Sequence, residues 1–101
     1  MTRVREVADH VRSKNAGPFQ VTIDLFCGTD EAFGRLCAGL SDGRVAAALG
    51  VEAGRLRRFD LPQLRVVKIS APRPTVQGAL DDRDMHGASF AVLVAELHLE
   101  G

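Results

Sequence analysis

The chain has 101 residues, of which 46% are hydrophobic and 26% charged, and its thirteen basic side chains balance thirteen acidic ones. This composition excludes the disordered and fibrous classes, and the length fits a single domain over residues 1–101 with a core of its own. Because the charges cancel, no net field draws the chain onto nucleic acid or an anionic membrane. Any binding that depends on charge must therefore be local.

Two further features bear on location and chemistry. Charged residues interrupt the first ten positions, and no apolar run approaches the roughly 20 residues of a membrane span. Cys27 and Cys37 have neither the density of a disulfide scaffold nor the spacing and companion ligands of a zinc site. We therefore expect a soluble, cytoplasmic protein with reduced thiols, no bound metal and no cofactor.

The N-terminal segment is predicted to form a short helix followed by a strand. Hydrophobic residues recur with helical spacing at Val4, Val7, Ala8 and Val11. Gly17 and Pro18 are expected to end this helix. The hydrophobic period then changes to two, which predicts a strand over Gln20–Cys27 with one buried face.

Two more helices are expected after this strand. Thr29 or Asp30 can cap the first one, which carries an apolar stripe. Ser41 or Asp42 can cap the second, and Gly50 is a suitable residue to end it. Both helices should therefore lie with one face against a core.

The rest of the chain is predicted to be extended, apart from one long loop. Strands are expected over Leu56–Asp60 and Leu64–Ala71, separated by a reversal that contains Pro62. No hydrophobic period survives over Pro72–Ala88, so this stretch is predicted to be a loop, and long loops in small domains are often functional. A final strand is expected over Phe90–Leu99, where the second face is also partly apolar and should be covered by a helix or another subunit.

The predicted order is helix, strand, helix, helix, strand, strand, strand. This order is typical of an α+β fold in which helices cover a sheet in a two-layer sandwich. We expect a mixed or antiparallel sheet of about four strands with two to three helices.

The first candidate site is the polar loop predicted after the first helix. Arg12, Ser13, Lys14 and Asn15 place two cations, a hydroxyl and an amide beside a glycine turn. Arginine offers a planar fork and lysine a mobile charge, so the loop could hold a carboxylate or phosphate. The alternative is structural, since cations at a helix C-terminus complement its dipole.

The second candidate is an acidic loop that contains one histidine. In an extended segment Asp82, Asp84 and His86 would share one side, where they could bind a metal or transfer a proton. Histidine suits proton transfer because its ordinary pKa is about 6.5. The alternative is a solvated loop in which the carboxylates pair with Arg83, Arg73 or Lys14.

A third pattern resembles the first half of a DNA-binding helix-turn-helix. It covers Val45–Leu56 and would place a recognition helix directly afterwards. Pro62 interrupts that second helix before it completes two or three turns. The zero net charge also disfavours DNA binding.

Taken together, the two polar loops resemble a small uncharacterised bacterial family whose members accompany proteins like acyclic terpene utilisation protein A (AtuA). The similarity rests on Arg12–Phe19, Thr22–Asp24, Val67–Pro74, Gly78 and Asp82–Ala88. It implies a ferredoxin-like α+β domain that works beside a larger AtuA-like chain in the metabolism of organic acids or their thioesters.

From the residues and this resemblance we expect an accessory or catalytic small subunit. In a reaction of the lyase or hydratase type, cations would hold a substrate carboxylate while His86, positioned by Asp84, moves a proton. A non-catalytic protein-interaction domain, or one that self-associates, is the alternative, and neither requires nucleic acid or a membrane. The predicted substrate-binding residues are Arg12, Ser13, Lys14, Asn15, Arg73, Asp82, Arg83 and Gly87.

Overall fold

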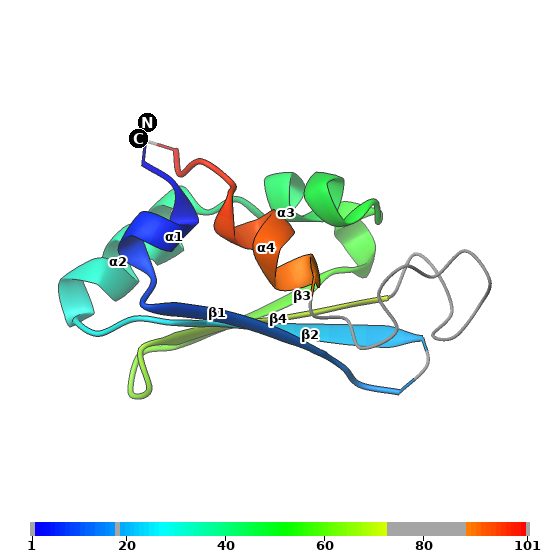
Figure 1. The fold of residues 1–101 in the computed structure, drawn as a ribbon, viewed down its shortest axis with the longest axis horizontal. Coiled ribbons are helices and arrows are strands. Elements are labelled where there is room, and N and C mark those ends of the chain that lie inside the picture. The colour runs from blue at the N-terminus through cyan, green and yellow to red at the C-terminus, as the bar shows by residue number, and fades with distance from the viewer. Residues whose placement is uncertain (1, 18, 73–88, 101) are drawn as a thin grey trace.

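The computed structural model describes residues 2–17, 19–72 and 89–100. Within them, helices lie on one face of a four-stranded sheet (Figure 1). None of the described helices is long and apolar enough to cross a membrane. The elements are α1 (Val4–Val7), β1 (His10–Asn15), β2 (Gln20–Phe26), α2 (Asp30–Gly39), α3 (Asp42–Leu49), the 3-10 helix η1 (Ala53–Arg55), β3 (Arg57–Leu61), β4 (Val66–Pro72) and α4 (Ser89–Ala95).

The sheet has the order β1-β2-β4-β3, and each neighbouring pair of strands is antiparallel. The prediction of a two-layer α+β sandwich with an antiparallel sheet is therefore confirmed. The described part of the chain holds four α-helices and one 3-10 helix, somewhat more than the two to three expected. The additional α-helix is α4, where the sequence pattern predicted a strand, whereas α1 was predicted as a longer helix.

The topology is that of a ferredoxin-like sandwich with one strand supplied from the other end of the chain. β2 and β3 run parallel with β4 between them, joined through α2 and α3, which is a split β-α-β unit. β4 then leads towards α4, and N-terminal β1 occupies the position beside β2 that a last strand would take. The two chain ends meet, because the Leu99 amide donates to the Thr2 carbonyl at 2.8 Å.

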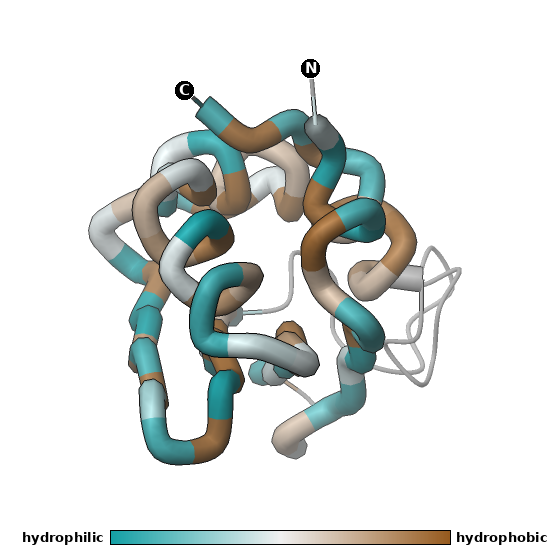
Figure 2. Tube along the Cα trace, turned by 90° about the vertical axis from the view of Figure 1, so that its left-hand side faces the viewer, coloured by the Kyte–Doolittle hydropathy of each residue, from teal (hydrophilic) through white to brown (hydrophobic). Residues whose placement is uncertain are grey.

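The core lies between the sheet and the helices. In β2, Val21, Ile23 and Leu25 are buried as predicted, and in the register they face Ala71, Ile69 and Val67 of β4. Hydrophobic (brown) and hydrophilic (teal) stretches are interspersed along the chain (Figure 2), and buried and more exposed residues alternate along β2 and most of β4. The alternation in β2 and β4 therefore places one face of each strand in the core.

The predicted caps of α2 and α3 are confirmed. Thr29 Oγ1 accepts a hydrogen bond from the Ala32 amide at 3.1 Å, and Ser41 Oγ accepts one from the Arg44 amide at 3.1 Å. Gly50 ends α3 with a φ of 74°, a left-handed conformation that glycine adopts without strain.

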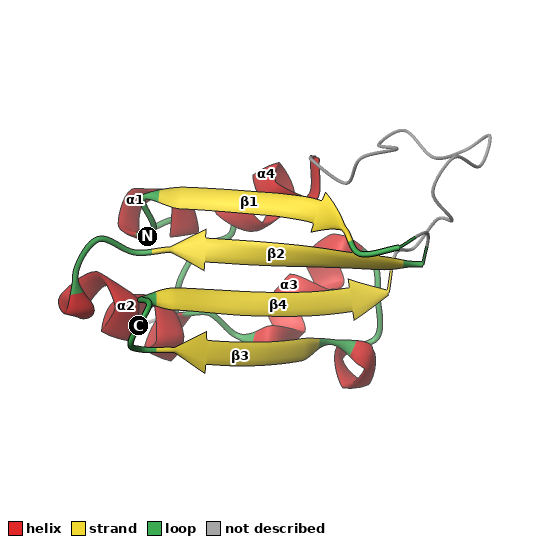
Figure 3. Cartoon of the chain, turned by 90° about the horizontal axis from the view of Figure 1, so that it is seen from below, coloured by secondary structure: helices red, strands yellow, loops and turns green. Residues whose placement is uncertain are grey.

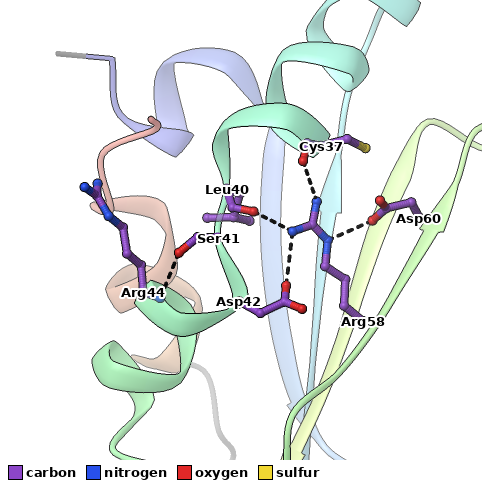
Figure 4. Close-up of polar contacts among 7 residues, drawn as sticks. All are labelled: Cys37, Leu40, Ser41, Asp42, Arg44, Arg58 and Asp60. Carbon is purple, nitrogen blue, oxygen red and sulfur yellow. Dashed lines mark hydrogen bonds and ion pairs between the residues drawn. The ribbon is translucent and has the colours of Figure 1, made fainter. Parts of the chain in front are cut away.

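Arg58 of β3 joins the sheet to the junction between α2 and α3 (Figure 4). Its guanidinium donates to the carbonyl oxygens of Cys37 and Leu40 and pairs with Asp42 at 3.1 Å and Asp60 at 2.9 Å. Burial alone would lower the pKa of Arg58, but hydrogen bonds and charges of Asp60 and Asp42 raise it. The charged guanidinium thus satisfies carbonyl groups at the end of α2 that no helical amide reaches.

The predicted N-terminal helix is too long. α1 ends at Val7, and His10–Asn15 forms strand β1, paired along its length with β2. The spacing of Val4 and Val7 is helical, but from residue 10 the exposure alternates with the period of a strand. Pairing with β2 thus decides the conformation, as tertiary context often does.

The predicted C-terminal strand is also wrong over most of its length. Ser89–Ala95 forms helix α4, and only the following segment is extended, with a bridge between His98 and Arg3. A short apolar run has no clear period, so its pattern cannot separate a strand from a helix. In the helix, Val94 enters the core while Val92 is 61% exposed.

Candidate functional site: the open face of the sheet

Among the described residues, all helices lie on one face of the sheet, which leaves the other face, the open face, without a covering layer (Figure 3). Because side chains alternate along a strand, the strand register defines which residues share this face. In three transverse rows from β1 to β3, they are His10, Phe26, Val66 and Leu61; Arg12, Asp24, Lys68 and Phe59; and Lys14, Thr22, Ser70 and Arg57.

The open face carries a local surplus of positive charge although the whole chain is neutral. Arg12, Lys14, Arg57 and Lys68 are all exposed, and Asp24 is the one carboxylate in the three rows. Within the described residues, none of the four cations forms an ion pair of 4.0 Å or less. They are thus available to an anionic group.

Two polar atoms at the centre of this face lack partners. Thr22 Oγ1 and Asp24 Oδ1 are shielded from solvent, and neither makes a hydrogen bond within the part of the chain that the structure describes. Asp24 lies between Arg12 and Lys68 in the register, where facing Cβ atoms are about 5 Å apart. Buried polar groups are nearly always paired in native proteins, so a polar group placed beside these two atoms would be stabilised there.

A hollow of about 440 Å³ opens beside the edge strand β1, and we name it the edge hollow. It combines two cations with the Asp24 carboxylate, whose Oδ1 has no partner within the described residues, and with apolar surface. Arg12 and Lys14 are charged groups at its wall, and Phe26 and Ala91 add apolar contacts. The complete lining is residues 11–14, Asp24, Phe26 and Ala91.

A second hollow, of about 480 Å³, lies where β3 begins and β4 ends, and we name it the end hollow. Two arginines, a serine hydroxyl and a glutamine amide line it, so its wall is mostly polar. The complete lining is Gln20, Gly54, Arg55, Arg57, Ser70 and Pro72.

The first group of predicted site residues belongs to a strand and not to a loop, which corrects the sequence prediction. As a consequence the group divides between two faces of the sheet. Arg12 and Lys14 lie on the open face, whereas Ser13 and Asn15 lie on the side of the helices. Ser13 Oγ accepts a hydrogen bond from the Ala91 amide at 2.9 Å and thereby contacts the first turn of α4.

The second group of predicted site residues lies outside the described residues. It consists of the catalytic pair His86 and Asp84 and the binding residues Arg73, Asp82, Arg83 and Gly87. Within the described residues, no three His, Cys, Asp or Glu side chains gather as a metal site would require. Because His86 and Asp84 lie outside the described residues, the hypothesis of proton transfer by His86 stays a prediction.

The sequence reasoning missed several residues of the open face. The strand pattern already placed Thr22 and Asp24 on the face opposite the core, but it could not bring them beside Lys68 or Ser70. That proximity depends on the strand register, which a single sequence does not give. The sequence pattern assigns Arg55 only to the disfavoured helix-turn-helix and Arg57 only to the predicted strand Leu56–Asp60, so neither arginine is predicted as a site residue.

No recognition helix follows α3. The residues in that place form η1 and then strand β3, so the described chain lacks the second helix of a helix-turn-helix.

The thiols contribute little reactivity, because burial raises the pKa of both Cys27 and Cys37. Both side chains are free thiols, as predicted.

The fold and this face define the protein as a small two-layer α+β domain whose basic sheet surface is not covered by any element that the structure describes. The chain belongs to the family described as a domain of unknown function (DUF4387), whose model matches residues 4–98. No curated protein and no solved structure shows significant similarity to it.

Proposed function

We propose that the protein is a small accessory subunit that binds a larger protein chain through its open face and completes an anion-binding site there. The observation that carries this proposal is the pair of shielded atoms Thr22 Oγ1 and Asp24 Oδ1, which have no partner within the described residues and lie beside cations that form no ion pair there. A partner that supplies donors and anionic groups would satisfy both.

The edge hollow, which is lined by residues from both faces of the edge strand β1, is suited to a small carboxylate. Arg12 can present two parallel N–H donors to a carboxylate, and Lys14 adds a mobile charge two residues further along the same face. Phe26 offers apolar contact to the carbon skeleton of the same ligand. An organic acid or its thioester is therefore the substrate class that we propose.

The resemblance to companions of AtuA-like proteins names the class of the larger chain. In this proposal the reaction is of the lyase or hydratase type, with His86 as the proton-transfer group and Asp84 as its orienting carboxylate. In the assembled complex, His86→Gln should abolish turnover and leave the mass of the complex unchanged. Full turnover in that variant would remove the catalytic role.

The carboxylate site is tested on the isolated chain by nuclear magnetic resonance titration with succinate. We expect shifts at β1 and β2 amides, and affinity about tenfold weaker in the double variant Arg12→Gln and Lys14→Gln, because charged hydrogen bonds are lost. Arg5→Gln, which removes a surface cation on α1, is the matched control. Equal affinity in the double variant and the control would contradict the site.

A purely structural interaction domain is the second candidate. Phe59 favours it, since this side chain is 50% exposed in the row of Lys68 and Asp24 and gives the open face an apolar contact. This candidate requires the partner to bind equally well with and without a small anion. It also requires that substitutions in the edge hollow weaken assembly and not turnover.

A further inference from the structure

The described arginines divide into two groups by their contacts. Of the nine in the described ranges, six donate to a described carboxylate, carbonyl or hydroxyl group. The remaining three, Arg12, Arg55 and Arg57, make no such contact within those ranges, and all three line one of the two hollows. Arg12 belongs to the edge hollow, so the end hollow contains two arginines whose role is unexplained.

We propose that the end hollow binds a phosphate group of a small-molecule ligand, held by the guanidinium groups of Arg55 and Arg57 and by the side chains of Ser70 and Gln20. This site does not depend on the edge hollow or on a protein partner. It lies on residues that the sequence prediction did not assign to any site.

Arg55 and Arg57 line the same hollow because the residue between them is held against the core. Leu56 packs against the core, so its neighbours on either side remain at the surface. Arg55 is the last residue of η1, and Arg57 is the first residue of β3, directly opposite Ser70 in the register. The two guanidinium groups therefore extend from a short, well-anchored segment.

The surrounding charges favour an anion in this hollow. The nearest carboxylate along β3 is Asp60, which is already paired with Arg58 at 2.9 Å and lies on the helix side of the sheet. Glu52, at the start of η1, is exposed and is not among the residues that line the hollow. Two like charges two residues apart repel each other, and a bound anion would relieve that repulsion.

The number of donors favours phosphate over carboxylate. Each guanidinium has five N–H groups, and Ser70 and Gln20 add a hydroxyl and an amide. One arginine fork engages both oxygens of a carboxylate, whereas a phosphate ester presents three terminal oxygens that two forks can share. In the register, Thr22 stands beside Ser70, and its unpaired hydroxyl continues the polar row from the hollow onto the open face.

The test is a titration of the isolated chain with inorganic phosphate and with a small phosphate monoester, glycerol 3-phosphate, at constant ionic strength. We expect both to shift amides of β3, η1 and the end of β4, and the double variant Arg55→Gln and Arg57→Gln to weaken binding at least tenfold. Arg35→Gln, on α2, is the matched control, because Arg35 donates to Thr2 and lies away from both hollows. Circular dichroism checks that each variant is folded.

Three outcomes would overturn the proposal. One is equal phosphate affinity in the double variant and the control. Another is tighter binding of succinate than of either phosphate compound at the same amides, which would assign the hollow to a carboxylate. The third is that a short single-stranded oligonucleotide binds the face much more tightly than the phosphate compounds, since Phe59 lies next to Arg57 along β3 and could stack on a base.

Discussion

At the scale of single residues, the unusual feature is polarity in the middle of a sheet face. Thr22 and Asp24 carry shielded oxygen atoms without partners in the described residues, and an unsatisfied buried group costs about 1–3 kcal/mol of stability. A protein that keeps two such groups side by side loses stability in the isolated state. Binding would recover that loss.

Thr22→Val tests this directly, because valine has nearly the same shape without the hydroxyl. We expect the isolated chain to gain about 0.5–1 kcal/mol in free energy of unfolding, measured by urea denaturation. Thr29→Val is the control with the opposite sign, since Thr29 caps α2 and its loss costs about 1 kcal/mol. A clear loss of stability in Thr22→Val would mean that its hydroxyl is satisfied in solution.

The buried thiols give a second prediction at this scale, in alkaline solution. Burial raises the pKa of Cys27 in the folded state, and the charges of Cys37 and Asp9 raise it further. The folded chain therefore holds its thiol proton at pH values where the unfolded thiol, with a pKa of about 8.5, has lost it. Stability is then fully present below pH 8.5 and falls as pH rises through the folded pKa. Denaturation of the wild type and of Cys27→Ala between pH 7.5 and 10.5 measures this, and an equal pH dependence in both would contradict it.

At the scale of elements, the sequence correctly predicted the helices and strands whose pattern and caps lie within their own residues. β2, α2 and α3 follow from alternation and from caps at Thr29, Ser41 and Gly50. The predictions for the segments that form β1 and α4 were wrong, because the conformation of each segment depends on the other and on the sheet. β1 becomes a strand by pairing with β2, and Ser13 of β1 then accepts from an amide of α4. The strand pattern could place Thr22 and Asp24 on the face opposite the core. Their neighbours Lys68 and Ser70 could be placed only with the strand register.

The junction of α2 and α3 is held by Arg58 of β3, an element distant in sequence, so replacing Arg58 should destabilise the fold. Arg58→Met should lower the free energy of unfolding by about 2–3 kcal/mol, because it leaves carbonyl groups and two carboxylates without their donor. Arg65→Met is the control, since its pair with Asp30 is exposed and should cost less than about 1 kcal/mol. Equal losses in a denaturation series would show that the Arg58 network is no stronger than a surface ion pair.

At the scale of the whole molecule, the order of strands in space matters more than their order along the chain. β1 fills the position of a last strand, and the ends of the described chain meet at Thr2 and Leu99. A circular permutant that begins at Phe19 and joins the original ends by a short glycine linker would have β1 as its last strand. We expect it to fold with the circular dichroism spectrum of the wild type, because chain ends that lie close together tolerate joining. A permutant that stays unfolded would show that the β1–β2 connection is needed for folding.

The central claim also concerns the whole molecule, and it is that the basic open face of the sheet binds a larger chain. The most direct measurement is the mass, by light scattering, of mixtures with the larger AtuA-like protein of the same organism. We compare the wild type, the double charge reversal Arg12→Glu and Lys68→Glu on the open face, and the matched reversal Arg5→Glu and Arg35→Glu on the helix layer. We expect the wild type and the helix-layer variant to form the complex and the open-face variant to remain free. Equal binding by all three, or a wild type that stays alone in the mixture, would contradict the account.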